Sequence, residues 1–151
     1  MIYQQEDFTP EVIDELKQLV ELHYAEVGPY QFDFSIDWDK YLAMQDVGIV
    51  RLFTARDDSD QHLCGYGIYI ISTHTHFATT IFAMQDALYL SPEYRGDGAG
   101  TSFVFACEAF MGDVDAVTQA VTPELDISET FKRAGYVPLE NLYVKKLTRL
   151  N

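Results

Sequence analysis

Apolar residues recur at spacings of three and four between Val12 and Val27, with polar residues at most positions between them. This is the periodicity of one face of an α-helix. Thr9 can cap the N-terminus of this helix, and Pro10 suits its first position because the N–H that proline lacks would have no partner there. Gly28-Pro29 then ends the run. The pattern predicts an amphipathic helix that packs on a sheet.

Short runs of β-branched and aromatic residues, bounded by turn residues, are typical of strands. They predict strands over residues 2–5, 49–55, 63–72 and 80–90, with an acidic hairpin tip over 56–62. A short helix is expected to begin at Asp37. His74 and His76 lie in the turn before the last of these strands and lack a third ligand, so a surface turn is favoured over a metal site and no metal is expected.

Three further elements are predicted in the C-terminal third of the chain. Residues 116–121 form a candidate strand, which should run parallel to the strand over 80–90 because a helix connects the two. A short helix is predicted over 128–134, closed by Gly135. The remaining segment, residues 136–147, is predicted to form an antiparallel pair of strands around Glu140-Asn141.

The segment from Ala87 to Phe110 has the order of an anion-binding site: strand, glycine-rich turn, helix. Gly96, Gly98 and Gly100 let the backbone approach a ligand, and the first turn of a helix has N–H groups without partners. These donors and the helix dipole favour a phosphate or diphosphate, and Arg95 adds a positive charge. A plain surface turn is the alternative. The glycine spacing differs from that of dinucleotide-binding and P-loop motifs.

Arg95, Gly98 and Gly100 match the signature "Arg/Gln, any, any, Gly, any, Gly/Ala", and the sequence therefore resembles the GNAT N-acetyltransferase family. A second segment, from Phe131 to Tyr136, resembles the late "aromatic, three residues, Gly-Tyr/Phe" signature of that family. The resemblance covers most of the chain and is to short stand-alone members of the phage or bacterial type.

This resemblance implies a GNAT-like fold of the mixed α/β type. The expected sheet is mixed but mostly antiparallel, with about six or seven strands, helices on both faces and a V-shaped split between strands 4 and 5. The resemblance also implies that acetyl-coenzyme A binds as a cosubstrate, with its diphosphate in the glycine loop. The residues expected to contact the cofactor are Leu88, Tyr89, Leu90, Arg95, Gly96, Asp97, Gly98, Ala99, Gly100 and Thr101.

Direct acetyl transfer to an amine requires a group that accepts the amine proton and benefits from an acid near the leaving thiolate. Asp86 is the candidate base, because alternation along its strand places it on an apolar face with Met84 and Leu88. A structural role for Asp86 is the alternative. Phe131 replaces the tyrosine that the family often has as the acid, so Tyr136 and Tyr143 are candidate donors, with Tyr89 as a further option. A third possibility is that the leaving thiolate needs no acid.

The segment that follows the first predicted helix is rich in aromatic residues and acids. In the resembled family this region helps to line the acceptor pocket, and carboxylates beside aromatic faces suit an amine cation. The candidate substrate-binding residues are Tyr30, Phe32, Asp33 and Trp38. The alternative is that these aromatics pack into the core, and aromatics exposed between Phe32 and Trp38 could serve a homodimer.

Charge limits the possible partners. The 151 residues hold 24 acids and 10 bases, a formal net charge of −14 at pH 7. This charge repels phosphate backbones, so direct binding to nucleic acid is not expected, whereas a cationic acceptor would be attracted. Acidity that only favours solubility is an equal alternative. The length predicts one domain over residues 1–151.

A cytoplasmic protein without a membrane partner is expected, since no apolar run approaches the roughly 20 residues of a membrane span and no signal peptide is recognisable. Cys64 and Cys107 fall in apolar stretches, so buried free thiols are favoured over a disulfide or a catalytic cysteine.

Three functions fit these residues. The first is acetyl transfer from acetyl-coenzyme A to a primary amine of a small molecule, peptide or protein. The second is a GNAT-fold binding module with weak or no turnover, which Phe131 favours. The third is an acidic interaction or inhibitor protein that mimics nucleic acid, which the net charge favours.

Overall fold

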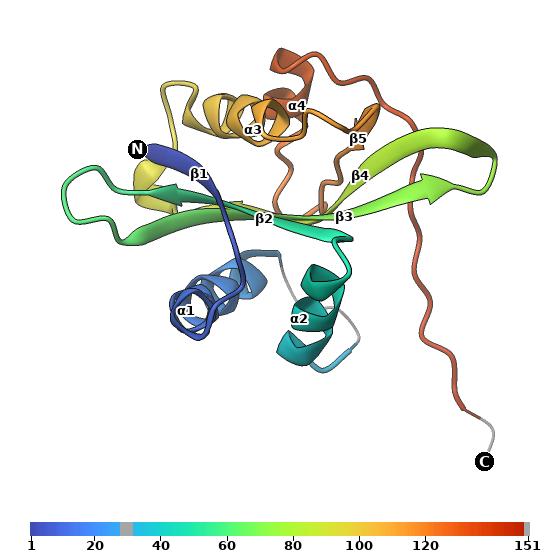
Figure 1. Ribbon diagram of the computed structural model, residues 1–151, viewed down its shortest axis with the longest axis horizontal. Helices are drawn as coiled ribbons and strands as arrows, with labels where there is room; N and C mark the ends of the chain where they lie inside the picture. The colour runs from blue at the N-terminus through green and yellow to red at the C-terminus, as the bar shows by residue number, and fades with distance from the viewer. Residues whose placement is uncertain (28–31, 150–151) are drawn as a thin grey trace.

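A five-stranded sheet in the order β1-β2-β3-β4-β5 separates two helical layers in the computed structural model, which describes residues 1–27 and 32–149. Neighbouring strands are antiparallel, except that β4 and β5 are parallel. In Figure 1, α1 and α2 lie on one face of the sheet and α3 and α4 on the other. The bounds are β1 Ile2–Glu6, α1 Pro10–Val27, α2 Trp38–Asp46, β2 Val50–Arg56, β3 Leu63–His74, β4 Phe77–Leu90, the 3-10 helix η1 Pro92–Tyr94, α3 Ala99–Ala109, β5 Ala116–Thr118 and α4 Ser128–Arg133.

The first two helices begin where their capping residues predict. The Thr9 hydroxyl accepts a hydrogen bond from the Val12 amide at 3.3 Å, and the Asp37 carboxylate accepts one from the Lys40 amide at 2.9 Å. Each bond satisfies an amide that has no partner inside its helix. The predicted amphipathic helix and the predicted helix at Asp37 are therefore confirmed.

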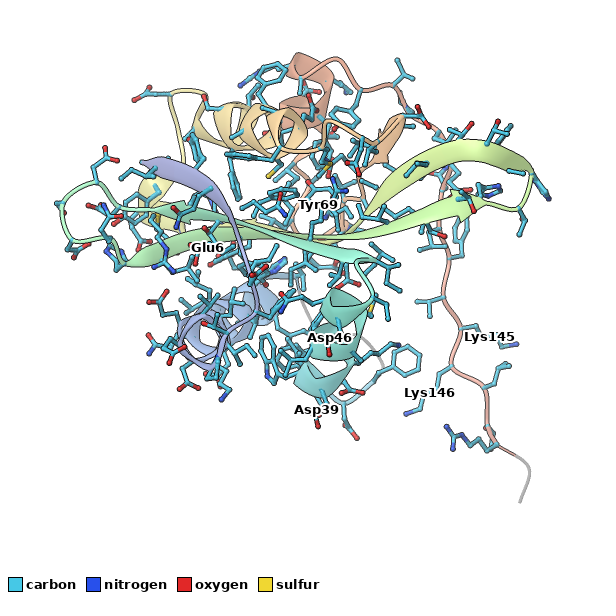
Figure 2. All side chains as sticks on the ribbon, viewed as in Figure 1. Glu6, Asp39, Asp46, Tyr69, Lys145 and Lys146 are labelled. Atoms are coloured by element: carbon cyan, nitrogen blue, oxygen red, sulfur yellow. The ribbon has the colours of Figure 1, made fainter. Side chains whose placement is uncertain are left out.

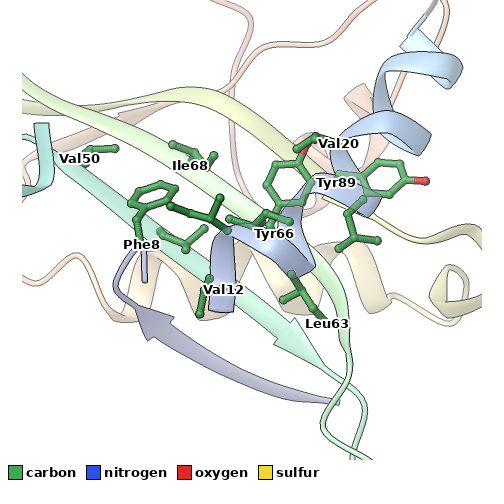
Figure 3. Close-up of a cluster of buried hydrophobic side chains, with 12 residues drawn as sticks. Phe8, Val12, Val20, Val50, Leu63, Tyr66, Ile68 and Tyr89 are labelled. Atoms are coloured by element: carbon green, nitrogen blue, oxygen red, sulfur yellow. The ribbon is translucent and has the colours of Figure 1, made fainter. Parts of the chain in front are cut away.

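Two apolar cores lie on opposite faces of the sheet. Figure 3 shows the core between the sheet and α1, where Tyr66 and Tyr89 come from adjacent strands and Val12 and Val20 come from α1. Burying one large aliphatic side chain contributes roughly 1.5–3 kcal/mol, so this face holds α1 firmly. The second core packs α3 on the sheet and contains Phe53, Leu88, Phe103, Val104 and Cys107. Both predicted thiols, Cys64 and Cys107, are buried and free.

The C-terminal segment differs from its prediction. Residues 137–149 form neither helix nor strand, so the antiparallel pair expected around Glu140-Asn141 is wrong. A strand needs a neighbour for its backbone hydrogen bonds, and no strand of the described residues pairs with this segment. The sheet consequently has five strands instead of the six or seven expected.

The fifth strand is also shorter than predicted, Ala116–Thr118 instead of 116–121. Its parallel direction is confirmed. It ends early because the next amide on that side, Ala120 N–H, bonds to the side-chain oxygen of Gln85 at 2.9 Å and not to backbone of β4.

A bulge in β4 changes which side chains share a face. Ala87 pairs with Ile68 and Gln85 pairs with Tyr69, so Asp86 is an extra residue without an opposite partner. The expectation that Asp86 shares an apolar face with Leu88 is therefore wrong, because alternation restarts after the bulge. None of the helices in the described residues is long and apolar enough to cross a membrane.

Candidate functional site

The glycine-rich turn that leads into α3 has an unusual backbone. Gly96, Asp97 and Gly98 have φ angles of 107°, 48° and 80°, so three consecutive residues lie in the left-handed region. Only glycine adopts this region without cost, and Asp97 is tolerated because aspartate is among the residues that visit it most readily. The turn brings the chain from η1 directly into the first turn of α3.

Backbone N–H groups in this turn are left without protein acceptors. The amides of Ala99 and Ser102 bond to Gly96 and Gly98 carbonyls. Within residues 1–27 and 32–149, no backbone or side-chain group accepts from the amides of Gly98, Gly100 or Thr101. These donors lie at the positive end of the α3 dipole, which is an arrangement that binds phosphate groups.

The turn forms one wall of a cleft of about 230 Å³. All ten residues expected to contact the cofactor line this cleft: Leu88, Tyr89, Leu90, Arg95, Gly96, Asp97, Gly98, Ala99, Gly100 and Thr101. A second wall comes from α4 and the segment before it, through residues that were not predicted: Leu125, Ile127, Thr130 and Arg133; Phe103 of α3 lines the cleft as well. Gly100 lies close to this wall, since a Cβ there would be 3.5 Å from Thr130.

Arg95 is held by protein groups. Its Nη1 and Nη2 donate to the two carboxylate oxygens of Glu26 at 2.9 and 3.0 Å, and its Nε donates to the Leu90 carbonyl at 2.7 Å. The hydrogen bond from Arg95 lowers the pKa of Glu26. Arg95 also lies over the Tyr89 ring, 5.3 Å from its centroid. Its charge is thus neutralised locally, and it fastens the turn to α1.

Arg133 is the cation that remains available in the cleft. It is exposed, lies on α4, and forms no ion pair with any carboxylate of the described residues. Its neighbour Lys132 is paired with Glu129 at 2.7 Å. The sequence carried a signal for Arg133, because it lies inside the segment from Phe131 to Tyr136 that resembles the late family signature.

The strands β4 and β5 separate beside this cleft. They pair only from Phe82 with Ala116 to Met84 with Thr118, and β4 then continues to Leu90 paired with β3 but not with β5. The bulged residue Asp86 lies in this part of β4. The structure therefore places the predicted base on the same stretch of strand as three of the predicted cofactor residues, Leu88, Tyr89 and Leu90.

Asp86 is exposed and accepts a hydrogen bond from the hydroxyl of Tyr41, a residue of α2. This exposure follows from the bulge, which takes Asp86 out of the alternation with Leu88. Desolvation, followed by the hydrogen bond to Asp86, raises the pKa of Tyr41. Tyr41 stays a neutral donor as a result, and it fixes the direction of the carboxylate.

The two candidate acids occupy different environments. The Tyr136 hydroxyl donates to Glu108 at 2.6 Å and accepts from the Gln119 amide at 3.2 Å, just after β5. Burial, with the hydrogen bond to Glu108 second, raises the pKa of Tyr136. Tyr143 is 88% exposed in the C-terminal segment. Phe131, in place of the family tyrosine, is buried in the core below α4.

The described candidate acceptor residues, Phe32, Asp33 and Trp38, lie between α1 and α2 or at the start of α2. Trp38 is half-buried and lies against Tyr41, with ring centroids 6.0 Å apart. Phe32 is 50% exposed, and Asp33 is exposed. Tyr30 lies outside the described residues. Of these candidates, Trp38 is thus the one that the structure places next to Asp86 through Tyr41.

Known proteins match this chain in fold but not in sequence. No family model matches the sequence, and no curated protein matches it. Solved structures do match. An acetyltransferase from Trypanosoma brucei is 11% identical with a TM-score of 0.71, over 97% of this chain and 100% of that chain. An aminoglycoside acetyltransferase from an uncultured soil metagenomic sample, solved with sisomicin, is 15% identical with a TM-score of 0.67, over 99% and 97%.

A third structure, glucosamine-6-phosphate N-acetyltransferase from Arabidopsis thaliana, is 12% identical with a TM-score of 0.65, over 98% of this chain and 100% of that chain. The chain has the GNAT acetyltransferase fold. The GNAT-like fold that the resemblance implied is confirmed, including the mixed sheet and the split between the fourth and fifth strands. At these identities the likeness establishes the fold alone.

Proposed function

We propose that this chain is an N-acetyltransferase that moves an acetyl group from acetyl-coenzyme A to the primary amine of a cationic small molecule, peptide or protein, within one domain over residues 1–151. The observation that carries the proposal is the set of amides at Gly98, Gly100 and Thr101 that find no acceptor in residues 1–27 and 32–149 and that belong to residues lining a cleft at the N-terminus of α3. A diphosphate supplies the acceptors that these N–H groups lack.

The charges around the cleft fit this ligand. The Glu26 carboxylate of α1 is paired with Arg95, so it does not place an uncompensated negative charge beside the turn. Arg133 lies on the second wall and can approach a phosphate oxygen. Asp97 is exposed at the rim, where solvent screens its charge. Local donors can therefore bind an anion despite the net charge of −14.

The proposed reaction is a direct transfer. The amine nitrogen forms a bond to the thioester carbonyl carbon, the carbon–sulfur bond breaks, and the thiolate leaves as coenzyme A. Asp86 accepts the proton of the amine, directly or through a water. Tyr136 supplies a proton to the thiolate in preference to Tyr143, because Tyr136 is held beside Gln119 at the end of β5.

The acceptor is proposed to be cationic. Asp86 offers a carboxylate next to the rings of Tyr41 and Trp38, and a protonated amine is stabilised by both kinds of group. Asp33 and Phe32, in the segment before α2, are also exposed. The strongly acidic chain would also attract cations at long range.

A binding module that retains the cofactor but lacks turnover is the second candidate. Phe131 cannot donate a proton, and the hydroxyl proton of Tyr136 is directed to Glu108 at 2.6 Å. Both facts weaken protonation of the thiolate without affecting the glycine turn. This candidate predicts binding of coenzyme A and no acetyl transfer.

Two measurements separate the candidates. Acetyl-coenzyme A and coenzyme A should each raise the melting temperature, since a ligand at 100 times its Kd stabilises the native state by about 2.7 kcal/mol. Release of free thiol in a panel of primary amines should then follow only if acetyl transfer occurs. Binding without thiol release supports the binding module. Absence of any shift contradicts both candidates and favours the acidic interaction protein.

A further inference from the structure

The tip of the β2–β3 hairpin, residues 57–62, is the loop at the left of Figure 1. It contacts η1 through Tyr94, whose hydroxyl oxygen lies 2.8 Å from a carboxylate oxygen of Asp57 and 3.0 Å from Nε2 of His62. The other ring nitrogen of His62, Nδ1, lies 2.6 Å from a carboxylate oxygen of Asp60. Asp57, Asp60, His62 and Tyr94 are here called the clasp.

The three contacts of the clasp require three protons. Asp57 and Asp60 are carboxylates near neutral pH, and a carboxylate only accepts hydrogen bonds. The hydroxyl proton of Tyr94 is therefore donated to Asp57, and Nδ1 of His62 must donate to Asp60. The Tyr94 oxygen has no second proton, so it can only accept from Nε2. The geometry is consequently that of a cationic His62 with a proton on each ring nitrogen.

A neutral His62 cannot keep all three contacts, because its ring carries a single proton. With that proton on Nδ1, the bare Nε2 faces the Tyr94 oxygen, unless the hydroxyl proton turns away from Asp57. With the proton on Nε2, the bare Nδ1 faces the Asp60 carboxylate. Each neutral arrangement has one hydrogen bond fewer than the cationic one. Loss of the proton therefore opens one contact of the clasp.

The charges that face His62 favour its cationic form. The hydrogen bond with Asp60 raises the pKa of His62, and the negative charges of Asp57 on the tip and Glu93 on η1 act in the same direction. The side chain is 49% exposed, so it exchanges protons with solvent. His62 is thus expected to lose its proton only as pH rises above its ordinary value of 6.5.

The tip itself is attached to the body by other groups. Arg56, just before the tip, donates to the Gln61 carbonyl at 2.8 Å and is paired with Glu6 at 2.6 Å. Glu6 lies on the side of the sheet that faces α1 (Figure 2). The N-terminal ammonium of Met1 binds Asp58 at 2.8 Å. The tip is therefore a fixed support, and a change in the clasp acts on η1.

The clasp meets the chain directly before the glycine turn. Tyr94 is the last residue of η1, and Arg95 follows it. The start of this segment is attached elsewhere, since the Ser91 amide donates to the Cys64 carbonyl at 2.8 Å. The side chain of Arg95 is attached to Glu26 of α1. Tyr94 thus joins the segment to the hairpin tip beside the residues that line the cofactor cleft.

We propose that protonation of His62 closes the clasp and thereby orders the glycine turn, so that the turn binds its anionic ligand more tightly when His62 is cationic than when it is neutral. The identity of that ligand, coenzyme A, rests on the proposed function. Ordering a loop before binding reduces the entropy that binding costs. The clasp is exposed, so affinity should fall about threefold as His62 loses its proton, which is the range of an exposed ion pair.

An NMR titration of the full chain without ligand tests the clasp itself. The amide signals of Gly96 and Gly98 should shift with the same pH midpoint as the ring signals of His62. In Tyr94→Phe, which keeps the ring and removes the hydroxyl, His62 should still titrate and the glycine signals should no longer follow it. His23 does not interfere, because its pKa is about 4. Glycine signals that ignore His62 in the wild type, or that still follow it in Tyr94→Phe, would overturn the proposal.

Calorimetric titration with coenzyme A at about pH 6 and about pH 8 tests the effect on binding. The phosphates of coenzyme A also change their ionisation in this range, so the ratio of the two affinities is compared between proteins. This ratio should be about threefold larger in the wild type than in His62→Gln, which has no titrating ring. The matched control is His76→Gln, at an exposed histidine in the turn between β3 and β4, and it should keep the wild-type ratio.

The outcomes separate this inference from the proposed function. Equal ratios in the wild type and in His62→Gln, with coenzyme A bound by both, would overturn the inference and leave the proposed function intact. Failure of every protein to bind coenzyme A would contradict the proposed function and the affinity effect together. The glycine signals would still decide whether the clasp orders the turn, since that titration contains no ligand.

Discussion

Glu26 of α1 and Arg95 of the glycine turn form a two-pronged ion pair, with nitrogen–oxygen distances of 2.9 and 3.0 Å, although they are 69 positions apart in the chain. The same carboxylate accepts the hydroxyl of Tyr89 at 2.8 Å. Burial, with the bond to Glu26 second, raises the pKa of Tyr89 to about 12. The turn that presents the free amides is thus anchored to the opposite face of the sheet by one carboxylate.

Arg95→Met should therefore reduce stability more than the same substitution at an exposed arginine without partners would. It removes the pair with Glu26, the bond to the Leu90 carbonyl and the contact with the Tyr89 ring. Because the pair is partly exposed, the expected loss is about 1 kcal/mol, with weaker coenzyme binding as the turn loosens. Urea unfolding measures the loss. Unchanged stability would contradict the anchoring role.

Arg133→Met, in contrast to Arg95→Met, should weaken coenzyme binding without reducing stability. Arg133 is exposed and lines the cleft, so its loss should leave the unfolding free energy unchanged and weaken coenzyme A binding about fivefold, or about 1 kcal/mol. Lys132→Met is the matched control. It removes the same charge one residue away, at a side chain that is paired with Glu129. Calorimetric titration at low salt compares them. Equal affinities in the two variants would remove Arg133 from the site.

Gly98→Ala tests the backbone conformation of the turn. Gly98 has a φ of 80° with open space around its missing Cβ, and Gly48, at the turn between α2 and β2, has a φ of 75° and equally open surroundings. Each alanine should therefore cost about 1–2 kcal/mol of stability. Only Gly98→Ala is expected to weaken coenzyme binding, by tenfold or more, because the free amides shift. Similar affinities in the two variants would place the ligand elsewhere.

Asp86→Asn tests the proposed base. Acetyl transfer should fall at least a hundredfold, the usual contribution of general base catalysis, while coenzyme binding is retained. Asp46→Asn, at the end of α2, makes the same change at an exposed acid away from the split and should be neutral. Tyr41→Phe removes the donor to Asp86 and should cause a smaller loss. An Asp86→Asn enzyme with unchanged rate and pH profile would exclude the base role.

The sequence predicts the parts of this molecule that local chemistry decides. The helix start at Thr9, the cap at Asp37 and the glycine turn at Gly96–Gly98 each depend on residues a few positions apart, and each is found where predicted. Periodicity places α1 and its buried face for the same reason. The fold itself was expected from the resemblance of the glycine turn and of the segment from Phe131 to Tyr136 to the GNAT family.

Features that depend on distant residues could not be predicted. The bulge at Asp86 breaks the alternation that placed it on one face with Leu88, and nothing in the local sequence marks an extra residue. The pairing of Arg95 with Glu26 joins elements that only the fold brings together. Residues 142–144 have the composition of a strand but pair with no strand of the described residues, because strand formation depends on a partner edge as well as on composition.

His23 makes stability depend on pH. Its Nδ1 is 2.7 Å from the Tyr66 hydroxyl, and its ring stacks on Tyr89 with centroids 4.8 Å apart. Burial lowers the pKa of His23 from 6.5 to about 4. Between these two values the unfolded chain binds a proton at this histidine and the folded chain does not, so acidification favours unfolding.

The expected loss of stability from His23 is roughly 3 kcal/mol as pH falls from 6.5 to 4. His23→Gln should make the unfolding free energy depend less on pH between about pH 7 and pH 5, whatever the variant's stability at neutral pH. His62→Gln is the control, because the hydrogen bond with Asp60 raises the pKa of His62. Its stabilisation is present below pH 6.5 and is lost as pH rises through its folded value, which is the opposite sign. Urea unfolding of the three proteins measures the slopes, and equal slopes for wild type and His23→Gln would show that folding does not lower the pKa of His23.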